Sequence, residues 1–90
     1  MSISDFLSTG RENSVPLRHL EAATGLSGRD VRRMISAERL AGVPILSDNQ
    51  SGYFLPATEA EAQRCARSMR HRAREIERAA VAIESAVGEV

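Results

Sequence analysis

The chain has 90 residues, enough for one compact core but not for two large domains. Its hydrophobic share of 42% and charged share of 27% exclude a disordered chain. No stretch approaches the roughly 18 apolar residues of a membrane span, so we expect a globular protein of the cytoplasm.

The net charge is zero, which alone argues against a nucleic-acid partner, because binding to phosphates needs clustered positive charge. The distribution of charge argues the other way. All 12 basic residues are arginine, and the segment from Arg64 to Arg74 holds five of them without an acid. Arginine donates hydrogen bonds in a planar fork that suits phosphates and guanine edges.

The N-terminal segment is expected to form a short helix that begins at Ser2 or Ser4 and ends at Gly10. Three of its side chains should point inward: Ile3, Phe6 and Leu7. A polar loop over residues 11–14 follows.

A second helix should begin at Pro16, since proline suits the first position of a helix, and it should end at Thr24 and Gly25. Apolar residues recur in it at helical spacing: Leu17, Leu20 and Ala23.

A third helix should run from Ser27, a strong N-cap residue, to about Ala41. Three apolar side chains share its inner face: Val31, Met34 and Ile35. This arrangement turns a largely basic set outward: Arg29, Arg32, Arg33, Ser36 and Arg39.

A β-hairpin is expected next, with strands at 43–46 and 53–55 joined by a turn at 48–52. Pro44 and Pro56 lack an amide donor, so each belongs at a strand end or on an edge. A small sheet of two or three strands satisfies this condition, because it offers edge positions for both prolines.

Thr58 and Glu61 have the spacing of a capping box, and no proline or glycine follows until Gly88. A single helix of about 28 residues is therefore expected. Its apolar residues alternate in steps of four and three, as in a coiled-coil seam: Ala62, Ala66, Met69, Ala73, Ile76, Ala80, Ile83, Val87 and Val90. The expected fold is mainly α with a small hairpin, with one domain over residues 1–57 and the long helix over 58–90.

This order of elements resembles a winged helix-turn-helix, in which the helix after the turn lies in the major groove of DNA. The segments "TGLSGRDVRRMI", "AGVPI" and "SGYFLP" are similar to the N-terminal domain of biotin operon repressors. Small winged-helix proteins of phages and prophages also look similar, including "PATEAEA" at the start of the last helix. The resemblance covers roughly half of the chain and implies a DNA-binding function.

The candidate DNA-binding residues lie on the third helix and in the hairpin turn: Ser27, Arg29, Arg32, Arg33, Ser36, Arg39, Asn49 and Gln50. Arg29 and Arg32 are placed to read base edges, and Arg33 and Arg39 to hold phosphates. The turn carries Asp48 and no basic residue, so we expect a weak contribution from the wing. Arg11 and Arg18 are further candidates for phosphate contacts.

One residue departs from the family pattern. At Glu38, one turn after Ile35, the family normally places an apolar core residue. We expect either that Glu38 meets an arginine or that Leu40 replaces its packing.

The long helix predicts self-association as a homodimer through six seam residues: Met69, Ala73, Ile76, Ala80, Ile83 and Val87. An antiparallel pair would match Arg70 with Glu84, whereas a parallel pair would match Arg72 with Glu77. Charge therefore leaves the orientation open. Alternatively, the start of the helix packs on its own domain and leaves a frayed tail.

No enzyme, cofactor, metal site or small-molecule substrate is expected, because no catalytic or ligand pattern rises above chance and His19 and His71 lack ligand neighbours. Cys65, the one cysteine, is expected to be a small part-buried side chain. The leading interpretation is a transcriptional regulator of phage or mobile-element type. The alternatives are an accessory factor of excision or replication, and a winged-helix protein–protein interaction module that no longer binds DNA.

Overall fold

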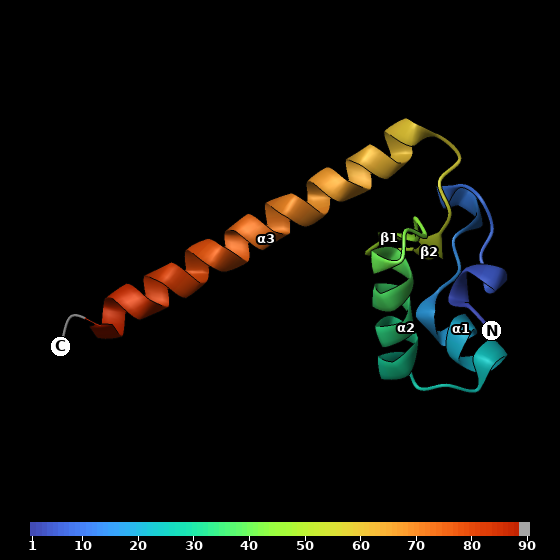
Figure 1. The fold of residues 1–90 in the computed structure, drawn as a ribbon, viewed down its shortest axis with the longest axis horizontal. Helices are drawn as coiled ribbons and strands as arrows, with labels where there is room; N and C mark the ends of the chain where they lie inside the picture. The colour runs from blue at the N-terminus through green and yellow to red at the C-terminus, as the bar shows by residue number, and fades with distance from the viewer. Residues whose placement is uncertain (89–90) are drawn as a thin grey trace.

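The computed structural model, which describes residues 1–88, shows a small N-terminal domain from which one long helix projects (Figure 1). The mainly helical architecture with a two-stranded hairpin and a long last helix is confirmed. The elements in chain order are the 3₁₀ helices η1 (Ile3–Phe6) and η2 (Arg11–Asn13), α1 (Leu17–Thr24), α2 (Gly28–Leu40), β1 (Leu46–Asp48), β2 (Gly52–Phe54) and α3 (Glu59–Gly88). This order is compatible with a winged helix.

The ends of α1 and α2 follow from local chemistry. Pro16 is the N-cap of α1 rather than its first residue, and Gly25 ends α1 in the left-handed conformation at φ 74°. Ser27 begins α2, where its Oγ accepts a hydrogen bond from the Asp30 amide at 3.1 Å. The short connection over residues 25–27 holds α1 and α2 side by side.

The N-terminal helix is shorter than the sequence predicts. Only one 3₁₀ turn forms, and the chain is already extended at Leu7. The cause is pairing with the hairpin: the Leu55 amide donates to the Ser8 carbonyl at 2.9 Å, and the Gly10 amide donates to the Leu55 carbonyl at 2.8 Å. The expected loop at 11–14 contains η2.

The hairpin begins three residues later than the sequence predicts. The segment after α2 turns back toward the end of the helix and is not yet a strand, because the Val43 amide donates to the Glu38 carbonyl at 2.9 Å. Pairing starts at Leu46, which lies opposite Phe54, and ends at Asp48, which lies opposite Gly52. Gly52 is therefore a strand residue rather than part of the turn.

Val15 forms an isolated antiparallel bridge with Tyr53, which adds a third strand of one residue, the Val15 rung, to the sheet. Its amide donates to the Tyr53 carbonyl at 2.8 Å, and the Tyr53 amide donates back to the Val15 carbonyl at 2.9 Å. The close approach needs a glycine next to it, because a Cβ on Gly52 would collide with the Val15 carbonyl oxygen. The hairpin is thereby fixed to the chain that enters α1.

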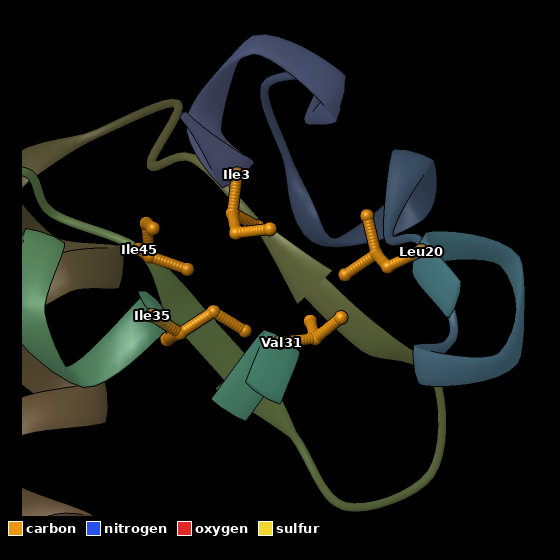
Figure 2. Packing of buried hydrophobic residues seen from close by; sticks show 5 residues of the cluster. All are labelled: Ile3, Leu20, Val31, Ile35 and Ile45. Atoms are coloured by element: carbon orange, nitrogen blue, oxygen red, sulfur yellow. The ribbon is translucent and has the colours of Figure 1, made fainter. Parts of the chain in front are cut away.

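The core lies between η1, α1, α2 and the approach to β1 (Figure 2). Five buried side chains form it: Ile3, Leu20, Val31, Ile35 and Ile45. Met34 packs against this cluster from a half-buried position. Ala23, which the spacing places on the inner face of its helix, is exposed.

Neither expectation for Glu38 is correct. Its carboxylate accepts hydrogen bonds from the backbone amides of Ile3, at 2.7 Å, and Ser4, at 3.1 Å. Glu38 thus satisfies the free amides at the start of η1, which no intrahelical carbonyl can reach. Leu40 does not replace a core residue, because it is 91% exposed.

Thr58 caps the long helix α3 as predicted, because its Oγ1 accepts from the Glu61 amide at 3.1 Å. The Glu61 carboxylate accepts from the Ala57 amide at 2.8 Å rather than from the Thr58 amide that a capping box uses. The first two turns rest on the domain near β1 and half-bury four residues: Glu61, Ala62, Cys65 and Ala66. Every residue from 67 to 88 is exposed. Within residues 1–88, no helix is long and apolar enough to span a membrane.

Candidate nucleic-acid interface

Four of the predicted site residues are exposed to solvent on the outer face of α2. Arg29, Arg32, Arg33 and Ser36 are all exposed, while Val31 and Ile35 on the opposite face are buried. The burial of two apolar residues four positions apart fixes the rotation of the helix, so the arginines point away from the core. Ser27 is exposed at the start of α2, where its hydroxyl already caps the helix.

Arg39 does not point freely outward as expected. Its Nε donates to the Ile45 carbonyl at 2.7 Å, and its Nη2 donates to the Ser47 hydroxyl at 3.2 Å. The side chain therefore ties the end of α2 to β1, which helps to fix the hairpin beside the outer face of α2. Arginine has five N–H donors, so these two bonds do not exhaust it.

The hairpin turn presents Asn49 and Gln50 to solvent, as the sequence predicts. The negative charge of Asp48 beside them is partly offset, because its carboxylate accepts from the Gln50 amide at 2.8 Å and forms an ion pair with Arg11. The Gln50 amide and the Arg11 guanidinium hold the pKa of the Asp48 carboxyl below its usual value, against an opposing effect of burial. Sequence reasoning offered Arg11 as a phosphate ligand and missed this partner.

A groove of about 540 Å³ lies between the hairpin, the start of α1, the outer side of α2 and α3. Arginines from all three helices line it: Arg18, Arg32, Arg39 and Arg72. Asn49 and Gln50 form its rim on the hairpin side. The structure thus brings one residue of the Arg64–Arg74 segment to the face that carries the predicted recognition helix.

A second groove, of about 640 Å³, lies on the other side of the hairpin turn against the start of α3. Arg11, Arg64 and Arg72 line it together with Glu61. The hairpin turn, which has no basic residue of its own, is consequently flanked by arginines on both sides. A sequence alone cannot show this, because residues 11, 18 and 64–72 meet there only through the fold.

The six predicted self-association residues form a solvent-exposed stripe along α3. The exposed fractions of its larger side chains are 39% for Met69, 71% for Ile76, 66% for Ile83 and 65% for Val87. Ala73 and Ala80 lie between them and are also exposed. Val90, the last residue of the predicted seam, lies outside the described residues.

Comparisons with protein-family models, with curated proteins and with solved structures found no match for this chain. Within residues 1–88, no three histidine, cysteine or acidic side chains gather in a way that could hold a metal ion. The geometry and charge of the α2 face and of the grooves beside it are therefore the features that point to a function.

Proposed function

We propose that this protein is a winged helix-turn-helix protein that binds double-stranded DNA, with α2 as the recognition helix and the β1–β2 hairpin as the wing. The observation that carries the proposal is the groove beside the hairpin, which collects arginines from α1, α2 and α3. A phosphate backbone is the partner that matches such a surface, because several arginines can each replace a condensed counterion.

Arg29 and Arg32 lie in the N-terminal half of α2, where helix-turn-helix proteins reach base edges. Arg32 also lines the groove, so it lies where the outer face of α2, which would read bases, meets the groove that would bind phosphates. Arg33 is exposed on the same helix and is assigned to the backbone, as are Arg18 and Arg72. Arg39 orients the wing and offers its remaining donors to a phosphate.

The wing contributes Asn49, Gln50 and backbone amides, while Arg72 of α3 supplies the positive charge that the turn lacks. The pairing of Asp48 with Arg11 reduces the repulsion that a free carboxylate would exert on the backbone of DNA. The wing and α3 thus act together on one side of the recognition helix.

In this proposal the protein acts in the cytoplasm as a homodimeric transcriptional regulator of the phage or mobile-element type, without enzymatic activity or a cofactor. An accessory role in excision or replication would use the same surface. A module that holds only a protein partner is the alternative from another class.

Titration of the full-length protein with random-sequence duplex DNA over a range of salt concentrations separates these classes. We expect binding whose log K falls linearly with log salt, with a slope of roughly −0.9 for each phosphate contacted. Arg72→Ala should reduce the magnitude of the slope by about 1. Absence of binding at low salt would reject the proposal in favour of the protein-partner module.

A further inference from the structure

The exposed apolar stripe of α3 is symmetrical about residue 78. Beyond the turns that rest on the domain, its residues form three pairs at equal distances from this point: Met69 with Val87, Ala73 with Ile83, and Ile76 with Ala80. We propose that two copies of this chain associate through the stripe as an antiparallel pair of α3 helices centred at residue 78. The pairing itself does not depend on DNA, whereas its consequence for DNA sites rests on the proposed function.

The sizes of the paired residues fit this arrangement. Ile76 of each chain would face Ala80 of the other, and Ile83 would face Ala73, so a large side chain meets a small one in four successive layers. Layers of nearly constant volume let two helices pack evenly and closely. A parallel pair would instead stack isoleucine on isoleucine and alanine on alanine, which gives alternately wide and narrow layers.

The structure selects one register among those that the heptad pattern allows. Sliding the partner by one heptad toward the domain would pair Ile83 with Ala66, but Ala66 is half-buried against its own domain. Sliding it one heptad the other way would bring Glu77 opposite Glu84 of the partner, which is repulsive. Only the register centred at residue 78 leaves the docked turns of α3 undisturbed and avoids that contact.

Charge on the flank of the stripe supports the same register. Arg70 of each chain would lie opposite Glu84 of the other, which makes two equivalent attractive contacts. One unfavourable contact remains, because Glu77 would lie opposite its own copy near the centre. This contact distinguishes the two orientations, because in a parallel pair Glu77 would instead lie opposite Arg72 of the partner.

A second copy fits because α3 projects clear of the domain (Figure 1). Three of its large apolar residues are at least 65% exposed: Ile76, Ile83 and Val87. A continuous apolar stripe of this kind is rarely left in water. The partner helix would cover it without displacing any packed residue of the domain.

The register sets the spacing of the two domains. Ala66, the last half-buried residue of α3, lies 12 residues from the centre, so the two copies of Ala66 would lie roughly 36 Å apart along the helices at 1.5 Å per residue. This length is close to one turn of B-DNA, about 34–36 Å. If the proposed function is correct, the dimer therefore demands half-sites in fixed helical phase.

Cysteine cross-linking of the full-length protein without DNA tests the orientation. In a Cys65→Ser background, Ala73→Cys is mixed with a size-tagged Ile83→Cys, and the mixture is oxidised. We expect a disulfide-linked heterodimer in the mixture and none when either variant is oxidised alone. Self-linkage of Ala73→Cys would show a parallel pair and overturn the proposal, as would absence of linkage in the mixture.

Sedimentation equilibrium of charge variants provides a second test that needs no cysteine in the seam. Arg70→Glu should raise the dimer Kd roughly tenfold, since two attractive contacts become repulsive, and Arg70→Glu with Glu84→Arg should restore it to within about twofold. Glu77→Gln should lower the Kd about twofold. A raised Kd for Glu77→Gln, or no recovery in the double variant, would contradict antiparallel pairing, whatever the outcome of the DNA titration.

Discussion

The assignment of α2 as the recognition helix depends most on Arg32. This residue is exposed, lies in the N-terminal half of the helix and lines the groove beside the hairpin. Arg32→Ala should weaken binding to a cognate site by roughly 1–3 kcal/mol and binding to random DNA much less. Fluorescence anisotropy with both duplexes measures the two effects. Equal losses would make Arg32 a phosphate ligand rather than a base-reading residue.

Arg78→Ala is the matched control for this comparison. It removes the same charge from α3, at an exposed position where Arg78 pairs with Glu75 at 3.1 Å. Because Arg78 lies beyond the groove, its loss should leave both affinities within about twofold of wild type, as is usual for an exposed ion pair. A loss as large as that of Arg32→Ala would indicate a general effect of charge and not a contact.

Glu38 is predicted to be important for stability rather than for DNA binding. Glu38→Gln keeps the size of the side chain but leaves one good acceptor for two amides, so the free energy of unfolding should fall by about 1.5–3 kcal/mol. Urea unfolding followed by circular dichroism measures this loss. Glu75→Gln, which alters an exposed ion pair, should change stability by less than about 0.5 kcal/mol.

The role of Glu38 could not be deduced from the sequence. An acid at a position where an apolar residue is usual signals a specific partner, but the partner is a pair of backbone amides 34 and 35 residues away. Backbone amides carry no sequence signature. Local rules worked where the partner is close in sequence, as at Ser27, whose hydroxyl binds the amide three residues on.

Among the elements, the hairpin depends on one close backbone approach. Gly52 has a φ of 122°, and a Cβ there would collide with the Val15 carbonyl. Gly42 also has a positive φ, of 101°, but a Cβ there meets open space. Gly52→Ala should therefore cost more than Gly42→Ala, by about 1–3 kcal/mol, because only the former adds overpacking to conformational strain. Thermal unfolding of both variants tests this order, and equal losses would show that the Val15 rung is not needed.

The boundaries of α1 and α2 were predicted to within one or two residues, because caps and glycines act locally. The first strand was placed three residues too early, because the Val43 amide bonds to the Glu38 carbonyl and pairing starts only at Leu46, opposite Phe54. The N-terminal helix was overextended, because residues 8–10 pair with Leu55 instead. Elements whose ends depend on pairing with distant chain segments were the ones that the sequence misjudged.

At the scale of the whole molecule, the sequence predicted a long helix and a seam but not where the domain ends and the seam begins. Ala62 and Ala66 belong to the same apolar periodicity as Ile76, yet they contact the domain. Burial divides this stripe into a part that packs on the domain, up to Ala66, and an exposed part over residues 67–88. The packing of α3 near the hairpin, which brings Arg72 into the same groove as Arg32 of α2, was likewise visible only in three dimensions.

Truncation of α3 tests whether this helix couples the DNA-binding domains of the two chains in the proposed dimer. A chain ending at Ser68 keeps the turns that rest on β1 and removes the exposed stripe, so it should remain folded by circular dichroism and sediment as a monomer. It should bind single half-sites weakly and no longer discriminate between half-site spacings that differ by fractions of a helical turn, about 10 base pairs. A folded, monomeric truncation that retains the spacing preference would show that α3 does not couple the recognition helices.

The claim that the outer face of α2 lies against the bases of DNA is tested most directly by site-specific photo-cross-linking. In a Cys65→Ser background, a short photoreactive group is attached at Ser36→Cys on α2 or at Ser85→Cys on the far part of α3, both exposed positions. With duplex DNA bound, we expect cross-links to bases from position 36 and none from position 85. Bound DNA that cross-links equally from both positions, or not at all from position 36, would contradict the assignment of α2 as the recognition helix.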